Sequence, residues 1–189
     1  MAWPQNKPRP AVFLDRDGVL NEDLGYVHRA DQLKIIAGVP AALEDLKNKG
    51  YLLLVVSNQS GVARGLFDLG AVEEFNRLLN EKLIAEKGGG LDGFFVCPHH
   101  PEGVVLAFKG PCACRKPEPG LILQACQKFN IDLATSFLVG DKPDDCECAV
   151  RAGVRPIQIH SRYGPVHPQA LAAVATLAEA VTYIPAVAV

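Results

Sequence analysis

The sequence predicts an α/β protein in which one parallel sheet lies between two layers of helices. Short apolar runs alternate with stretches that have helical spacing, which is the pattern of repeated strand–helix units. The apolar runs are continuous rather than alternating, as expected for strands that are buried on both faces. The length of 189 residues suits one domain of ordinary size, and we expect residues 1–189 to form a single domain.

The first half of the chain predicts three strands and two helices. Residues 11–14 form a short apolar run, residues 52–56 a longer one, and residues 94–96 a third. Residues 39–49 carry a helical apolar stripe and stop before Gly50, where a helix C-terminal glycine belongs. A second helix begins at the capping residue Asp68 and ends at the run of three glycines; its apolar stripe is Val72, Phe75, Leu79 and Leu83.

The second half continues the alternation after a loop at 97–117 that is rich in cysteine, histidine and proline. Helices are predicted at 119–129 and 144–152, and the second of these stops at Gly153. Strands are predicted at 137–139 and 154–159. The alanine-rich residues 169–180 predict a final helix, and residues 181–184 fit either strand or coil.

Charge and hydropathy exclude several classes of partner. Nineteen basic and 21 acidic side chains give a net charge of −2, with no basic stripe of the kind that binds nucleic acid or an anionic membrane. No apolar run approaches the roughly 20 residues of a membrane span, and the first residues lack the apolar core of a secretory signal. We therefore expect a cytoplasmic protein, and a monomer because no large exposed apolar stripe is evident. Its six cysteines are then thiols or metal ligands rather than disulfides.

Polar side chains follow directly after four of the predicted strands. They are the segments Asp15-Arg16-Asp17, Ser57-Asn58, the cysteine loop, and Gly140-Asp141-Lys142. Ligands of parallel sheets bind at the carboxyl ends of the strands, so these segments predict one common site.

Asp15 and Asp17 stand two residues apart, which places both carboxylates on the same side of an extended segment. Such a pair can hold Mg²⁺ beside a phosphate. One carboxylate can attack phosphorus and the other can donate and accept the proton. The alternative is an ordinary surface turn, since aspartate and glycine favour turns.

Cys97, His99, Cys112 and Cys114 form a Cys-x-His pair and a Cys-x-Cys pair, twelve residues apart. Three thiolates and one imidazole make a closed tetrahedral set, typical of structural Zn²⁺, which would order a loop at 97–114 that is rich in proline and glycine. The alternative is four unrelated side chains. His100 is interpreted as a loop residue, and Cys126, Cys146 and Cys148 lie outside the set.

The segment at 15–21, Asp-Arg-Asp-Gly-Val-Leu-Asn, resembles the first motif of the haloacid dehalogenase-like phosphatases, and three further motifs match in order. The resemblance implies their Rossmann-like parallel sheet, with Asp15 as nucleophile and Asp17 as general acid/base. Ser57 would hold phosphoryl oxygens and Lys116 would balance their charge. Mg²⁺ would be bound by Asp15, the Asp17 carbonyl and Asp141. Whether Asp144 or Asp145 assists the metal is left open.

The zinc loop narrows the resemblance to the D-glycero-D-manno-heptose 1,7-bisphosphate phosphatases and the related histidinol-phosphate phosphatases. The long spacer between the ligand pairs favours the heptose enzymes. That resemblance implies removal of the 7-phosphate, leaving a heptose 1-phosphate for lipopolysaccharide or surface-layer glycans. Arg115 would clamp the retained phosphate and Lys142 would contact the transferred one. The other implied substrate contacts are Asp23, Gly25, Tyr26, Ser57, Asn58, Gln59, Ser60 and Lys116.

Only 40 residues separate Asp17 from Ser57, which leaves no room for a separate cap domain. The substrate pocket must then be formed by the loop after Asn21 and by the zinc loop. Two other functions stay open: a phosphatase for histidinol phosphate or another small phosphomonoester, and a non-catalytic, zinc-stabilised binding module. The anomer preferred at carbon 1 is open as well.

Overall fold

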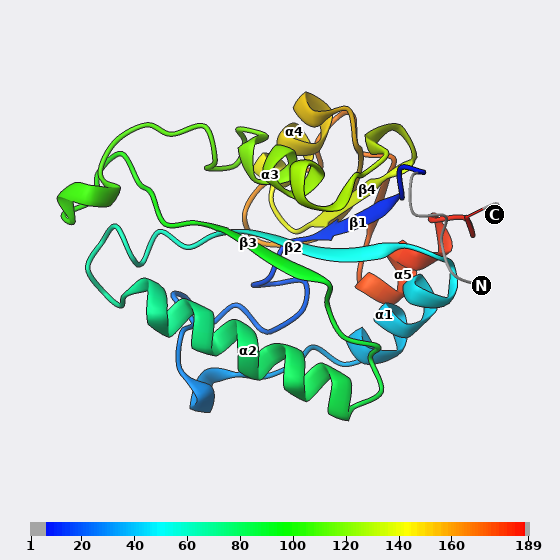
Figure 1. The fold of residues 1–189 in the computed structure, drawn as a ribbon, viewed down its shortest axis with the longest axis horizontal. Helices are drawn as coiled ribbons and strands as arrows, with labels where there is room; N and C mark the ends of the chain where they lie inside the picture. Colours follow the sequence, from blue (N-terminus) through cyan, green and yellow to red (C-terminus); the bar gives the residue numbers. More distant parts are fainter. Residues whose placement is uncertain (1–6, 188–189) are drawn as a thin grey trace.

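The computed structural model describes residues 7–187, and its centre is a six-stranded sheet in which all strands are parallel (Figure 1). The strand order is β3-β2-β1-β4-β5-β6, so the first strand along the chain lies in the interior of the sheet. The strands are β1 Ala11–Leu14, β2 Leu52–Asn58, β3 Gly93–Cys97, β4 Phe137–Gly140, β5 Arg155–Ile159 and β6 Ala172–Val174. The predicted fold class is confirmed.

Helices cover both faces of this sheet (Figure 1). Helices α1 (Val39–Asn48), α2 (Leu69–Ala85) and α5 (Leu177–Thr182) lie on one face. Helices α3 (Gly120–Phe129) and α4 (Pro143–Ala152) lie on the other. Short 3-10 helices occur at Ala30–Gln32, Leu106–Phe108 and Leu133–Thr135.

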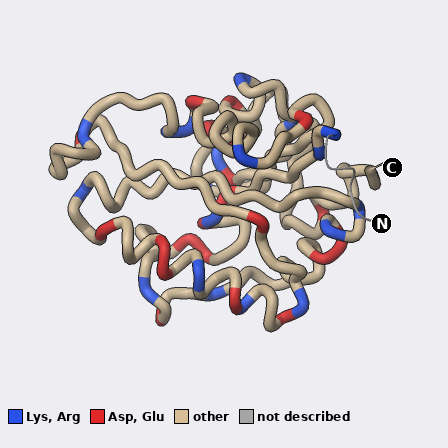
Figure 2. Tube along the Cα trace, in the orientation of Figure 1, with Lys and Arg blue, Asp and Glu red and all other residues tan. Residues whose placement is uncertain are grey.

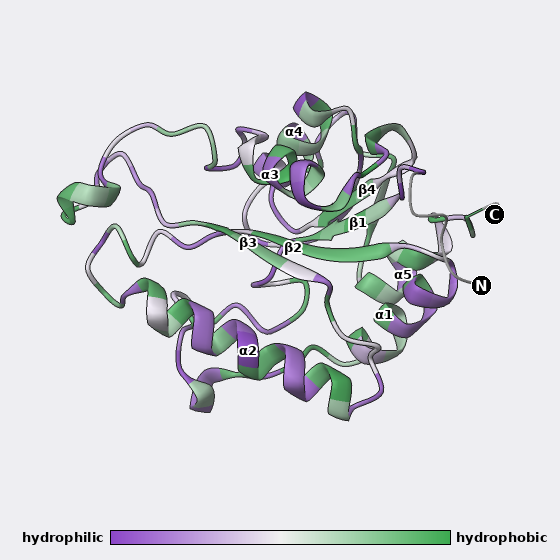
Figure 3. Ribbon diagram, viewed as in Figure 1, coloured by the Kyte–Doolittle hydropathy of each residue, from purple (hydrophilic) through white to green (hydrophobic). Residues whose placement is uncertain are grey.

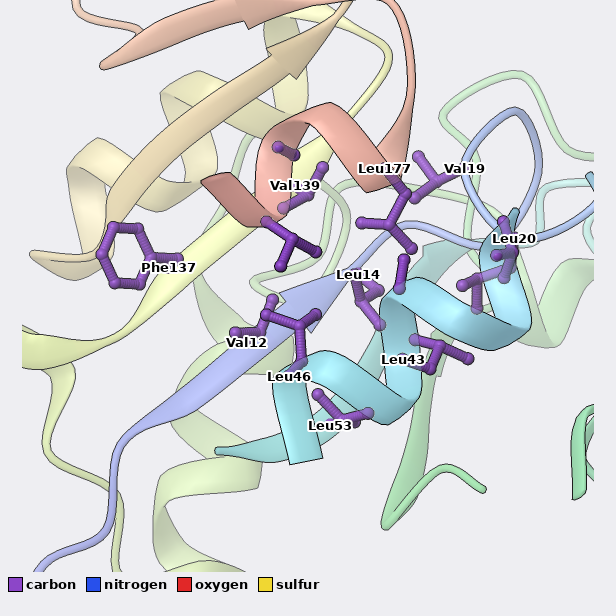
Figure 4. Packing of buried hydrophobic residues seen from close by; sticks show 14 of the residues in the cluster. Val12, Leu14, Val19, Leu20, Leu43, Leu46, Leu53, Phe137, Val139 and Leu177 are labelled. Atoms are coloured by element: carbon purple, nitrogen blue, oxygen red, sulfur yellow. The ribbon is translucent and has the colours of Figure 1, made fainter. Parts of the chain in front are cut away.

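Strand β1 separates two apolar layers because its successive side chains point to opposite faces. Val12 and Leu14 belong to the layer under α1, α2 and α5, and Figure 4 shows them beside Leu43 and Leu46 of α1. Ala11 and Phe13 belong to the layer under α3 and α4, and all of β1 is buried. Strands β1, β2, β3 and β4 are mostly hydrophobic, whereas polar and hydrophobic residues alternate along the helices (Figure 3). This burial holds the carboxyl end of β1 rigidly in the middle of the sheet.

The predicted helix ends are confirmed where a cap determines them. The Asp68 carboxylate accepts a hydrogen bond from the Ala71 backbone N–H at the start of α2. Gly153 ends α4 in the left-handed conformation.

The prediction of one final helix over 169–180 holds only for residues 177–180, and residues 181–182, predicted as strand or coil, extend that helix. Residues 172–174 instead form β6, which pairs with Ile157–Ile159 of β5, and α5 begins only after the cap at Thr176. The open edge of β5 offers backbone partners that outweigh the helix propensity of alanine. Strand β2 also runs two residues further than predicted, so Ser57 lies at the end of the strand rather than after it.

Three further features of the fold concern its charges, the hydropathy of its helices and the loop after β3. Acidic and basic residues are interspersed along the chain (Figure 2). Among residues 7–187, no helix combines the length and apolarity that a bilayer crossing requires. The residues between β3 and α3 form a long loop that extends beyond the carboxyl edge of the sheet (Figure 1).

Candidate active site

A cavity of about 360 Å³ lies where the described chain segments leave the carboxyl ends of β1, β2 and β4. This volume is in the range of small-molecule sites. The sequence-predicted nucleophile, acid/base, serine and lysine all line it, as do all the predicted substrate contacts. The lining residues are Asp15, Asp17, Asp23, Gly25, Tyr26, Ser57, Asn58, Gln59, Ser60, Gly61, Arg115, Lys116, Lys142, Asp144, Asp145 and Tyr163.

Lys116 is the buried centre of the site's ion pairs. Its Nζ lies 2.9 Å from Asp15 Oδ1 and 2.6 Å from Asp145 Oδ1, and it donates a hydrogen bond of 2.8 Å to the Val56 carbonyl. Burial opposes the charge, but Asp145 and Asp15 outweigh it and raise the pKa of Lys116 above its ordinary value. Burial likewise disfavours the Asp15 carboxylate, yet the charges of Lys116 and Lys142 lower its pKa. Asp15 is therefore ionised and available as a nucleophile.

Asp145 supports this arrangement with both oxygens. Oδ1 pairs with Lys116, and Oδ2 accepts a hydrogen bond of 3.0 Å from the Lys142 backbone N–H at the start of α4. Burial raises the pKa of this carboxyl. Gly140 permits the contact, since a Cβ there would lie 2.2 Å from the Asp145 Cβ. Both oxygens of Asp145 are thus committed to protein partners.

Asp141 is the member of the acidic cluster whose Oδ1 has only an ion pair with Lys142, at 3.4 Å. Its Oδ1 is buried, and no hydrogen bond to it is formed by the described residues. The carboxylates of Asp15, Asp141 and Asp145 each offer an oxygen, all within 4.8 Å of one another. Burial raises the pKa of Asp141 to about 7. Gly18, at φ +88°, lets the chain pass close, because a Cβ there would lie 2.5 Å from Asp141 Oδ2.

The charges of the site also fit a divalent cation. Five of the residues that line the cavity are aspartates, whereas three are lysine or arginine. Beside them, Asp141 adds a carboxylate and Arg16, paired with Asp17, adds a cation, so acids still exceed bases by six to four. A phosphate dianion would be repelled from this surplus unless a cation joined it. Oxygen ligands of this kind suit Mg²⁺.

Tyr163 closes one side of the cavity and was missed by the sequence analysis. Its hydroxyl donates a hydrogen bond of 2.6 Å to Asp23 Oδ2, and Lys142 Nζ lies 4.6 Å from the centre of its ring. Lys142 Nζ is also 3.4 Å from Asp141 Oδ1 and 3.8 Å from Asp15 Oδ2. Tyr163 follows the carboxyl end of β5, just as the predicted site residues follow the preceding strands. This position is the signal in the sequence that could have identified it.

The amides that follow Ser57 are already engaged within the protein. Asn58 exchanges two hydrogen bonds with the Lys116 backbone, at 3.0 and 3.1 Å. Gln59 Nε2 donates to Ser57 Oγ at 2.9 Å and to Asp17 Oδ2 at 3.1 Å. These two side chains hold catalytic candidates in place, and their contact with substrate stays a prediction.

The predicted zinc ligands come together in one cluster. The sulfur atoms of Cys97, Cys112 and Cys114 lie 3.0 to 3.6 Å apart. His99 Nδ1 lies 3.7 Å from the Cys97 sulfur and 3.5 Å from that of Cys114. Bonds of about 2.3 Å to sulfur and 2.0–2.1 Å to nitrogen at tetrahedral angles put ligand atoms about 3.5–3.8 Å apart. Four of the five distances fall in this range and the Cys97–Cys114 distance of 3.0 Å is shorter, so the residues fit zinc with a small outward movement of these two sulfur atoms. His100 is outside the cluster, as expected.

The cysteine cluster is linked directly to the cavity. The Arg115 guanidinium, next in the chain to Cys114, donates a hydrogen bond of 3.3 Å to the carbonyl of His99. The chain between Ala113 and Gly120 turns tightly, because a Cβ at Gly120 would lie 2.2 Å from the Ala113 carbonyl oxygen. A metal at the cluster would therefore determine where Arg115 and Lys116 stand.

The parallel sheet and this set of acids and lysine define a hydrolase of the haloacid dehalogenase-like class. A family model described as HAD-hydrolase-like matches residues 113–181. A D-glycero-beta-D-manno-heptose-1,7-bisphosphate 7-phosphatase of Yersinia pestis is 48% identical over 147 residues, 77% of each chain. The enzyme of the same name from Escherichia coli K12 is 44% identical over 164 residues, 87% of this chain and 85% of that protein.

A solved structure extends the comparison to three dimensions. The D,D-heptose 1,7-bisphosphate phosphatase from B. bronchiseptica, complexed with magnesium and phosphate, superposes with a TM-score of 0.79 at 30% identity. The alignment covers 92% of this chain and 97% of that one. The chain belongs to the D-glycero-β-D-manno-heptose-1,7-bisphosphate 7-phosphatase family.

Proposed function

We propose that this protein is a Mg²⁺-dependent phosphatase that removes the 7-phosphate of D-glycero-β-D-manno-heptose 1,7-bisphosphate and leaves heptose 1-phosphate. The observation that carries the proposal is its identity of 44–48% to enzymes of that name over more than three quarters of both chains. The site supports it, because the cavity brings an ionised aspartate, a second carboxylate and buried lysine together.

In the first step, a carboxylate oxygen of Asp15 attacks the phosphorus of the 7-phosphate. The bond between phosphorus and the sugar oxygen breaks, and Asp17 gives that oxygen its proton. An aspartyl phosphate remains on Asp15. Lys116 and Lys142, both near the Asp15 carboxylate, balance the charge of the phosphoryl oxygens, and Ser57 Oγ can donate to one of them.

In the second step, water attacks the phosphorus of the aspartyl phosphate. Asp17 accepts the proton of this water, so its starting protonation state returns. The bond between phosphorus and Asp15 breaks, which restores the carboxylate and releases inorganic phosphate.

Mg²⁺ would be held by the carboxylates of Asp15 and Asp141 and by the backbone carbonyl of Asp17. When bound, it supplies positive charge to the phosphoryl oxygens. Asp145 is an unfavourable fourth candidate, because Lys116 and the Lys142 N–H already take its oxygens. Zn²⁺ would be held by Cys97, His99, Cys112 and Cys114 in a structural site without an open position.

Arg115 is suited to the phosphate that is not removed. Its planar guanidinium pairs with two oxygens of a phosphate, and it lines the cavity beside Lys116. Asp23, in the loop that follows β1, has carboxylate oxygens that can accept hydrogen bonds from sugar hydroxyls.

Phosphate release with Mg²⁺ tests the proposal. The substrates are both anomers of heptose 1,7-bisphosphate, with histidinol phosphate and fructose 1,6-bisphosphate as comparisons. A preference of about 100-fold, equivalent to about 2.7 kcal/mol of transition-state binding, for one heptose anomer supports the proposal. Comparable rates on all four substrates would contradict the substrate assignment while leaving the phosphatase chemistry in place.

Asp15→Asn tests the nucleophile separately. We expect turnover to be abolished while zinc content is unchanged, because Asp15 is not part of the cysteine cluster. Retained turnover in this variant would contradict the assignment of Asp15.

A further inference from the structure

Arg16, the residue between the two catalytic aspartates, is completely buried. A buried guanidinium is costly unless all of its charge is matched by partners. The chemistry assigned above does not use this side chain. Its partners therefore indicate what it does.

Two nitrogen atoms of Arg16 donate hydrogen bonds to the carboxylate of Asp17. Nε lies 3.0 Å from Oδ1 and Nη2 lies 2.9 Å from Oδ2. This is the parallel, two-bond geometry in which a planar guanidinium fixes the plane of a carboxylate. Rotation of the Asp17 carboxylate would break both bonds together.

The rest of the guanidinium is anchored to three other segments. Nη2 donates to the carbonyl of Val27 at 2.7 Å and to Gln59 Oε1 at 3.2 Å. Nη1 donates to Asn76 Oδ1 of α2 at 3.2 Å, and the Phe75 ring centre lies 4.5 Å from the guanidinium carbon. The support of Arg16 thus extends from the loop after β1 to the loop after β2 and to the core-facing side of α2.

Asp17 receives four hydrogen bonds in total. Asn21 Nδ2 donates to Oδ1 at 2.9 Å and Gln59 Nε2 donates to Oδ2 at 3.1 Å, in addition to the two from Arg16. Two carboxylate oxygens have about four acceptor positions, so the anion is fully satisfied. A proton on Asp17 has to replace one of these donors. The neutral amide of Gln59 can leave more readily than the charged fork of Arg16.

We propose that Arg16 is the positioning residue of the acid/base Asp17, holding its carboxylate in the orientation from which it gives a proton to the leaving oxygen. This inference rests on the proposed function, in which Asp17 protonates the sugar oxygen. It adds a specific requirement: Arg16 matters for substrates whose leaving group must be protonated. It matters little for a leaving group that departs as an anion.

The experiment compares heptose 1,7-bisphosphate with p-nitrophenyl phosphate, whose nitrophenolate leaves without a proton. The quantity measured is kcat/KM, which covers the steps through cleavage of the phosphorus–oxygen bond. For Arg16→Lys we expect kcat/KM on the sugar bisphosphate to fall by about 100-fold, the lower range of general acid catalysis. On p-nitrophenyl phosphate we expect a fall of about threefold or less.

If kcat/KM falls equally on both substrates, Arg16 only supports the structure. If it falls on neither, Arg16 does not position Asp17. Each of these results overturns the inference. Asp17→Asn is measured in parallel. If that variant fails to separate the two substrates, the acid role in the proposed function is wrong. If it separates them and Arg16→Lys does not, the inference alone is wrong.

Two further variants address folding. Arg155→Lys is the matched control, since Arg155 also lies over a phenyl ring, that of Phe137 at 3.9 Å, but outside the residues that line the cavity. We expect it to leave both kcat/KM values unchanged. If Arg16→Lys does not fold, Asn76→Leu removes one anchor of Arg16, and Asn80→Leu, one turn further along α2, is its control. The inference is supported if kcat/KM on the sugar bisphosphate falls by about tenfold in Asn76→Leu, with no fall on p-nitrophenyl phosphate and no fall in Asn80→Leu. Any other pattern in a folded Asn76→Leu overturns it.

Discussion

Replacing Lys116 by methionine should destabilise the protein in a way that depends on pH. Lys116 is buried, and its ammonium donates to the two buried carboxylates of Asp15 and Asp145 and to a backbone carbonyl. Methionine fills a similar volume but leaves both acids without their shared cation. Removing one partner of a buried ion pair costs about 3–5 kcal/mol, and we expect a loss of that size in the free energy of unfolding at about pH 8.

The loss should shrink as the pH falls. Burial already raises the pKa of Asp145, and without Lys116 it rises further above the unfolded value of 3.8. The folded variant can therefore take up a proton at a pH where its unfolded chain does not, which relieves the penalty. In the wild type, the lowered pKa of Asp15 contributes stability that is present at neutral pH and is lost in acid. The first effect brings the two proteins closer together as the pH falls toward about 5, whereas the Asp15 contribution is lost only below the unfolded pKa of 3.8.

Urea unfolding of metal-free protein at about pH 8, 6.5 and 5 measures this difference. Lys142→Met is the control, because Lys142 is a third exposed and no nearer than 3.4 Å to a carboxylate; its loss should be about 1 kcal/mol or less. The double variant Lys116→Met/Asp145→Asn should recover about half of the loss. A loss below about 1 kcal/mol, or one that does not change with pH, would refute the reasoning.

Three further outcomes are expected. Cys112→Ser should lower both zinc content and activity, because the cluster supports the backbone that carries Arg115; full activity in a metal-free variant, measured by elemental analysis, would contradict the structural role of the cluster. With the pKa of Asp141 near 7 in the metal-free protein, protons compete with Mg²⁺ below that pH, so the affinity for Mg²⁺ should weaken by up to about tenfold for each unit below pH 7; calorimetric titrations that give a constant affinity between about pH 5.5 and 7 would exclude this. Tyr163→Phe removes the donor to Asp23 and keeps the ring beside Lys142, so KM for the sugar bisphosphate should rise by about 3- to 10-fold with kcat unchanged. An unchanged KM would show that this hydrogen bond has no part in substrate binding.

The sequence was informative wherever a local pattern determines the structure. Buried strands such as residues 11–14 are continuous apolar runs, and Asp68 caps α2 as its position predicted. The alanine-rich end misled because pairing with β5 decides its conformation, and no local pattern encodes that partner. A signal for α5 was nevertheless present in Thr176 and Glu179, which form a capping arrangement at the start of the helix.

The candidate site divides in a similar way. Residues directly after a strand were found, and all of the predicted substrate contacts line one cavity. The side chains that support them were not predicted. Arg16 resembles an ordinary exposed charge in the sequence, and only the packing of α2 shows that it is buried against Asp17. Whether Asp145 assists the metal was left open, because its hydrogen bond to the start of α4 and its ion pair with Lys116 require the folded geometry.

The surplus of carboxylates around the cavity is expected to lower the thermal stability of this protein. Five aspartates share the lining with three cationic side chains, and burial makes ionisation of Asp141 and Asp145 unfavourable. Asp141 and Asp145 are thus retained against a cost in folding. A laboratory selection for thermostability alone would be expected to discard these aspartates early, whereas a selection that also demands turnover would be forced to seek stabilising changes in the helices and the distant end of the sheet.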